Sequence, residues 1–151
     1  MGYPGGRMVN ARVETSRGPD GTPVVCARFD LSEAEVSAAC HAVNAARNEQ
    51  FRHEELSADD VLQMREVTAL ADELLALAAH KSAVTLELRP ARLVALRDSL
   101  YAFVARRDEA GFTREEDREA YAVAQSLAGP LADLCADALR AALDASAHAG
   151  C

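Results

Sequence analysis

Four histidines and four cysteines are the side chains in this sequence with the chemistry to bind a metal ion or act as nucleophiles. Metal-binding helical bundles place Glu three residues before His, so that both ligands share one helix face, and none of these histidines has such a neighbour. The closest pair at zinc-like spacing, His148 with Cys151, lies at the chain end. We therefore expect no metal site and no cofactor. The eight residues are His41, His53, His80, His148, Cys26, Cys40, Cys135 and Cys151.

No nucleophile in the sequence stands in a recognisable catalytic motif. There is no Gly-x-Ser-x-Gly turn and no glycine-rich phosphate loop. Cys40 and Cys135 fall on apolar helical faces, where a thiol is usually a small buried hydrophobe. We predict no catalytic residues, and a non-enzymatic protein is the preferred interpretation.

A stripe of mostly uncharged polar side chains follows the first predicted helix. Its members are spaced four, four, three and four residues apart, so they share one helix face. They are Glu33, Ser37, His41, Asn44 and Asn48. Such side chains are common where a helix meets a partner, although a solvated face also explains them. This stripe is the candidate partner-binding surface.

Arginines and carboxylates are interleaved between residues 89 and 118. The simplest interpretation is a set of surface ion pairs, each worth about 0–1 kcal/mol; anion or nucleic-acid binding is the less favoured alternative. The arginines are Arg89, Arg92, Arg97, Arg106, Arg107, Arg114 and Arg118, and the carboxylates are Asp98, Asp108, Glu109, Glu115, Glu116 and Asp117.

A second set of residues is the candidate lining of a small-molecule pocket between the first, third and fourth helices. The set is His41, Arg97, Tyr101, Tyr121 and Cys135. The two tyrosines are near the arginine cluster in sequence, but both also fit as half-buried packing residues. A ligand site of this kind requires a concave apolar cavity with a few convergent polar groups.

Composition limits the classes of partner. The 151 residues carry 24 Asp and Glu against 16 Lys and Arg, a net charge of −8 that argues against nucleic acid as the main partner. No apolar run is long enough to cross a membrane and no export signal is recognisable, so we expect a cytoplasmic protein with reduced thiols and no membrane partner. The single Lys and abundant Ala suggest a GC-rich bacterial genome.

Alternating and helical patterns predict the elements that carry these residues. We expect residues 1–7 to be disordered, and Met8–Glu14 and Thr22–Leu31 to form a β-hairpin across a turn-rich SRGPDG loop. Ser32 with Glu35 is a capping box for a helix to about Asn48.

The next helix, Ala58–His80, is apolar almost all round after Val67, which predicts a central helix surrounded by the others. Ser57 with Asp60 caps its start, and a short strand follows at Ala83–Leu88.

Two further helices complete the chain. One begins at Pro90 and ends near Glu109, before a Gly111 cap. The last is expected to begin with a Thr113 and Glu116 capping box and to continue to about His148, with a kink or break at Gly129-Pro130.

The two halves of the chain resemble each other. A shift of 57 positions aligns Leu31 with Leu88, Val36 with Leu93, and Leu74 with Leu131. This predicts repeat units 24–80 and 83–147, each with a strand and two helices, although any two helical hairpins rich in Ala and Leu look alike. The first helix has Ala39 and Ala46 where the third has Leu96 and Phe103, so one side of the bundle is thin and either packs closely or leaves room for a ligand or partner.

Together these features predict a single, mainly α domain. We expect a bundle of four or five helices, arranged as two αα-hairpins, with a short N-terminal β-hairpin and a third short strand. The preferred function is a non-enzymatic cytoplasmic interaction module, of a regulatory, adaptor or immunity type, that binds another protein or forms a homodimer. The alternative function is a helical bundle that binds a small molecule.

Overall fold

The protein, described by a computed structural model over residues 10–50 and 57–149, is mainly α-helical with one small antiparallel sheet, as the sequence predicts. Residues 1–7, predicted to be disordered, lie outside the described residues. The elements in chain order are β1 (Arg12–Arg17), β2 (Pro23–Leu31), α1 (Glu33–Gln50), α2 (Ala58–Ala78), β3 (Val84–Leu88), α3 (Pro90–Ala110) and α4 (Glu115–Ala149).

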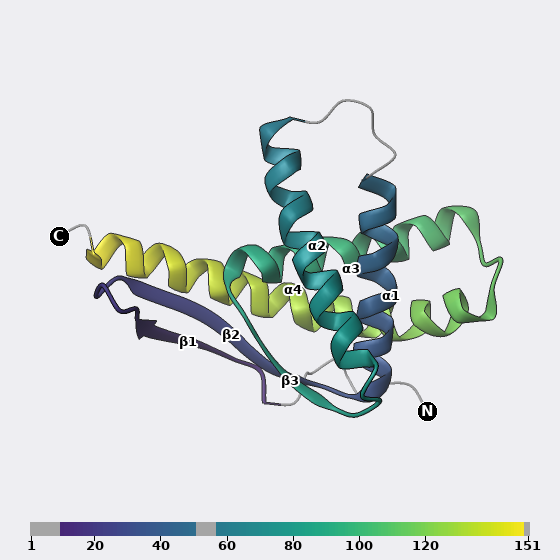
Figure 1. The fold of residues 1–151 in the computed structure, drawn as a ribbon, viewed down its shortest axis with the longest axis horizontal. Coiled ribbons are helices and arrows are strands. Elements are labelled where there is room, and N and C mark those ends of the chain that lie inside the picture. The colour runs from purple at the N-terminus through teal and green to yellow at the C-terminus, as the bar shows by residue number, and fades with distance from the viewer. Residues whose placement is uncertain (1–9, 51–56, 150–151) are drawn as a thin grey trace.

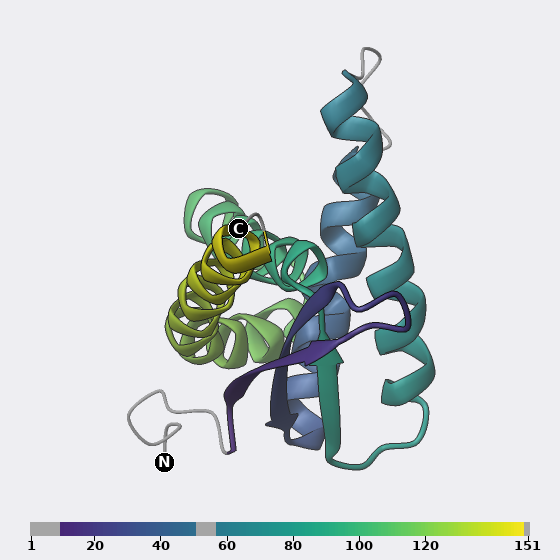
Figure 2. The ribbon, with the colours of Figure 1, turned by 90° about the vertical axis from the view of Figure 1, so that its left-hand side faces the viewer.

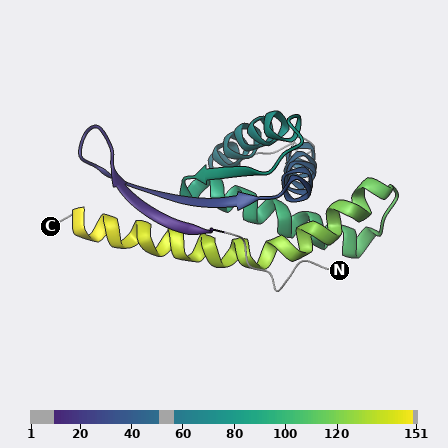
Figure 3. The ribbon, with the colours of Figure 1, turned by 90° about the horizontal axis from the view of Figure 1, so that it is seen from below.

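The helices form two antiparallel pairs that cross each other, α1 with α2 and α3 with α4 (Figures 1 and 2). The β1–β2 hairpin lies along the C-terminal half of α4, and Figure 3 shows the two side by side. Alternate residues of β2 are buried, among them Val25, Ala27 and Phe29, because one face of the sheet covers the helices.

The turn between β1 and β2 is shorter than predicted. Gly18 N–H donates to the Thr22 carbonyl at 2.8 Å, Thr22 N–H donates to the Asp20 carboxylate at 3.0 Å, and Gly21 adopts a φ of +80°. Because the turn needs only these residues, Arg17 pairs with Pro23, and β1 ends three residues later than the predicted strand.

Helix starts follow the predicted caps at three of four sites. Ser32 with Glu35, and Ser57 with Asp60, form both hydrogen bonds of a capping box, and α3 begins at Pro90. The predicted Thr113–Glu116 box is wrong, since α4 begins at Glu115 and its first backbone bond runs from Arg118 N–H to the Arg114 carbonyl.

The central helix is α1, not α2 as its apolar pattern predicts. Helix α1 contacts α2, α3 and α4, and Ala38 to Val43 are buried except for His41, which is half-buried. Helix α2 lies at the edge of the molecule (Figure 2), with Leu75 58% exposed. The pattern misled because a helix of small residues fits the crowded centre better than one rich in leucine.

Helix α4 is continuous through Pro130, so the predicted break is wrong. The ribbon does bend part-way along, as Figure 3 shows, which agrees with the alternative prediction of a kink. Ser126 hydroxyl donates to the Ala122 carbonyl at 3.2 Å one turn before the proline.

The register of β2 and β3 is the one that a two-fold relation between the halves requires. Phe29 lies opposite Leu86, its equivalent under the shift of 57, while Ala27 pairs with Leu88 and Leu31 with Val84. Helices α3 and α4 likewise begin 57 residues after α1 and α2. The repeat remains an interpretation of the sequence, and the strand register agrees with it.

Candidate functional site

The predicted polar stripe of α1 faces a surface groove between α1 and α4, which we call the α1–α4 groove. Ser37, His41 and Asn44 line this hollow of about 420 Å³. Its floor is built from small apolar residues of α1, α4 and the end of α2, which are Ala34, Ala38, Ala78, Ala120 and Val123. The groove therefore combines an apolar floor with a wall of hydrogen-bonding side chains.

The opposite wall of the groove is acidic. Glu116 and Glu119 project from the first turns of α4, both in exposed positions. Within the described residues neither carboxylate has a hydrogen-bond or ion-pair partner. The wall thus offers two unneutralised negative charges beside an apolar surface.

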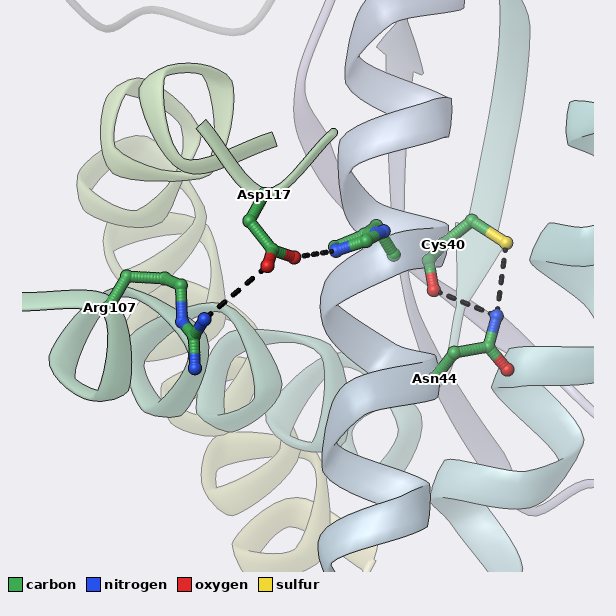
Figure 4. A network of polar contacts seen from close by, with 5 residues as sticks. Cys40, Asn44, Arg107 and Asp117 are labelled. Carbon is green, nitrogen blue, oxygen red and sulfur yellow. Dashed lines mark hydrogen bonds and ion pairs between the residues drawn. The ribbon is translucent and has the colours of Figure 1, made fainter. Parts of the chain in front are cut away.

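His41 is held in place by a chain of polar contacts that runs through Asp117 to Arg107, both labelled in Figure 4. Its Nε2 lies 2.7 Å from Asp117 Oδ1, and Arg107 donates to Asp117 Oδ2 at 3.4 Å. The His41 ring also packs edge-on against Phe103, with the ring centroids 5.3 Å apart. The imidazole is therefore fixed between α1, α3 and α4 rather than free to swing in the groove.

Cys40 and Asn44 form a second contact along α1. The Asn44 amide donates to the Cys40 carbonyl at 3.0 Å and to its Sγ at 3.4 Å, as Figure 4 shows. Burial raises the pKa of the Cys40 thiol, so the thiol stays protonated near neutral pH. A neutral thiol is a poor nucleophile, and this one acts in packing.

The two ends of the predicted stripe lie outside the groove. Glu33 is exposed at the start of α1 and does not line the groove. Asn48 lines a separate hollow of about 490 Å³ between α1, α3 and the start of α4. The stripe therefore runs across two hollows.

The structure brings Arg97 and Cys135 of the alternative pocket set into contact but does not gather the five residues around one hollow. Of these five residues only His41 lines the α1–α4 groove, and none lines the hollow that contains Asn48. Arg97 donates to Cys135 Sγ at 3.4 Å, Tyr101 is exposed, and Tyr121 donates to Asp108. Burial raises the pKa of the Cys135 thiol. A hollow does exist between the first, third and fourth helices, but other residues line it.

The arginine cluster forms ion pairs, some of them with residues far away in the sequence. Arg97 pairs with Asp98 and Arg118 with Glu115, both within the predicted cluster. Arg106 instead reaches Glu49 on α1, and Arg92 reaches Glu66 and Glu73 on α2.

The described part of the chain contains no group of three or more His, Cys, Asp or Glu side chains placed to hold a metal ion. His53 and Cys151 lie outside the described residues, as does the side chain of His148. None of the described helices is both long enough and apolar enough to span a membrane.

No family model, curated protein or solved structure matches this chain. The site must therefore be interpreted from its own geometry. Sequence reasoning identified Ser37, His41 and Asn44 but missed Glu116, which it assigned to surface ion pairs, and Glu119, to which it gave no role. The one available signal was that both glutamates share a face of the last helix without an arginine three or four residues away on that side.

Proposed function

We propose that the protein is a non-enzymatic cytoplasmic interaction module whose α1–α4 groove binds a basic segment of a partner protein. The observation that carries this proposal is the composition of the groove, in which the carboxylates of Glu116 and Glu119, without partners in the described part of the chain, flank an alanine-rich floor. A Lys or Arg side chain matches both parts, because its methylene stem packs on apolar surface while its charge reaches a carboxylate.

The polar wall of α1 supports the same proposal. Ser37 is exposed on this wall, and within the described residues its hydroxyl has no partner, which leaves it available to a peptide backbone. The net charge of −8 adds long-range attraction for a basic partner.

A binding role also agrees with the state of the reactive side chains. His41 is engaged by Asp117, and the thiol of Cys40 is buried with a raised pKa, so the two do not form an activated nucleophile and base. Cys26, Cys40 and Cys135 are unpaired thiols, which suits a reducing cytoplasm.

The proposal is tested by NMR titration of the ¹⁵N-labelled protein with a Lys- and Ala-rich helical peptide and with its Glu-substituted counterpart. We expect saturable shifts at Ser37, Asn44 and Ala120 with the basic peptide alone. The double variant Glu116→Lys with Glu119→Lys should abolish these shifts.

The matched control is Asp133→Lys with Asp137→Lys, which makes the same charge change at exposed positions of α4 outside the α1–α4 groove. Equal loss of binding in both double variants would show general charge attraction and overturn the groove assignment.

Native mass spectrometry adds the oligomeric state. A dimer that survives the Glu116 and Glu119 changes would place the interface elsewhere, with the exposed Leu139 and Leu143 of α4 as the first candidates.

A further inference from the structure

The hollow of about 490 Å³ between α1, α3 and the start of α4 differs in charge from the α1–α4 groove. We call it the arginine hollow, because Arg106, Arg107 and Arg114 all line it. Asn48 and Thr113 add neutral hydrogen-bonding groups, and Glu49 and Asp117 are the two carboxylates in its wall.

Both carboxylates are already engaged by protein groups. Arg106 donates to Glu49 at 2.9 Å, and Asp117 accepts from Arg107 at 3.4 Å while lying 2.7 Å from His41 Nε2. Arg114 is exposed, and its guanidinium group has no partner within the described residues. The hollow therefore has three guanidinium groups and two carboxylates in its lining. One positive charge is left to attract a ligand.

Arg107 is incompletely bonded. Its side chain is only 15% exposed, its single contact is long, and its Nε is the one buried side-chain nitrogen or oxygen among the described residues without a hydrogen-bond partner. Guanidinium groups form their strongest contacts with both oxygens of a carboxylate or phosphate. The protein leaves this Nε donor unused, but the atom is closed to solvent, so Arg107 contacts a ligand only through the part of its side chain that remains exposed.

The floor of the arginine hollow is apolar. Ala45 and Ala46 come from α1, and Ala102 and Phe103 come from α3. The small side chain of Ala46, where the equivalent position of α3 carries Phe103, leaves the space open. A ligand here would bury a compact hydrocarbon body on the floor and place an anionic group against the arginines.

We infer that the arginine hollow binds a small organic carboxylate with a compact apolar body. A single negative charge matches the one unpaired arginine, whereas a phosphate dianion or a nucleic-acid backbone would meet Glu49, Asp117 and the overall charge of −8. This site is separate from the groove of the proposed function and does not depend on it.

The test is an NMR titration of the full chain with benzoate, with benzyl alcohol as the uncharged analogue and inorganic phosphate as the anion without a hydrocarbon body. We expect benzoate to give saturable shifts at Ala45, Ala102 and Thr113, and the other two compounds to give none. Arg114→Ala should weaken benzoate binding by about tenfold, the usual loss for a hydrogen bond to a charged group.

Two further variants separate this site from general charge effects. Arg140→Ala removes the same charge from an exposed position outside the arginine hollow and should leave benzoate binding unchanged. Ala102→Leu, at an exposed position, should block the floor without unfolding the protein. The inference is overturned if benzyl alcohol binds as well as benzoate, if phosphate saturates the same residues, or if Arg140→Ala weakens binding as much as Arg114→Ala.

Discussion

Glu49 and Arg106 stand at equivalent positions of the two halves of the chain, 57 residues apart, and their side chains meet at 2.9 Å. Phe29 and Leu86, also equivalent under this shift, meet in the sheet. Under the predicted repeat, residues that contact their own counterparts lie on the two-fold axis that relates the halves, and that axis would pass through the sheet and between α1 and α3.

If this contact depends on charge alone, exchanging the two residues should preserve it. Glu49→Arg and Arg106→Glu alone should each lower the free energy of unfolding by up to about 1 kcal/mol, because the side chains are 42% and 54% exposed. The double variant should recover most of the loss. Urea unfolding of the four proteins checks this, and a double variant less stable than both single variants would contradict it.

Local signals made most of the fold predictable, while the site depended on how the helices cross. Ser32 and Ser57 act on backbone groups within three residues, so their roles can be inferred from sequence. The angle between the two helical hairpins cannot, and it is this angle that places Glu116 and Glu119 opposite Ser37. The predicted Thr113 cap is absent for a different reason. Helix α4 begins one residue later than predicted, so Thr113 is not the residue that precedes the helix.

The Ser57 cap, which forms, and the Thr113 cap, which does not, give a paired prediction. Ser57→Ala should lower the free energy of unfolding by about 1 kcal/mol, because the Asp60 backbone N–H loses its acceptor. Thr113→Ala should change it by less than about 0.5 kcal/mol, as expected for a surface position without a cap bond. Thermal and urea unfolding measure both, and an equal loss at the two sites would restore the Thr113 cap.

The packing around the small residues Ala39 and Ala46 of α1 can be tested with two leucine substitutions. Ala39 is fully buried, so Ala39→Leu should overpack the core and cost about 1–3 kcal/mol. Ala46 lines the arginine hollow, so Ala46→Leu should fold with little loss of stability. Urea unfolding separates the two outcomes. A stabilising Ala39→Leu would show a cavity beside α1 that the described packing does not contain.

The buried thiol of Cys135 predicts a loss of stability at alkaline pH. Burial raises its pKa in the folded protein, whereas the thiol ionises near its ordinary value of about 8.5 once the chain unfolds. The folded state keeps its full stability below that pH and loses part of it as the pH rises above it. Urea unfolding at pH 7 and pH 10 should show a smaller loss for Cys135→Ala than for the natural sequence. Equal losses would mean that this thiol does not contribute.

Asp117 joins His41 and Arg107, so neutralising it should destabilise the place where α1, α3 and α4 meet. Side chains of Asp117 and Arg107 are only 13% and 15% exposed, and Asp117→Asn would leave the guanidinium without a counter-charge in poorly solvated surroundings. We expect a loss of about 2 kcal/mol in the free energy of unfolding. The control is Asp98→Asn. The Asp98 side chain, which pairs with Arg97, is 42% exposed, so this substitution should lower the free energy of unfolding by less than about 1 kcal/mol. If urea unfolding gives equal losses for the two variants, Asp117 is an ordinary surface ion pair, and the fixed position of His41 in the α1–α4 groove must come from its contact with Phe103 instead.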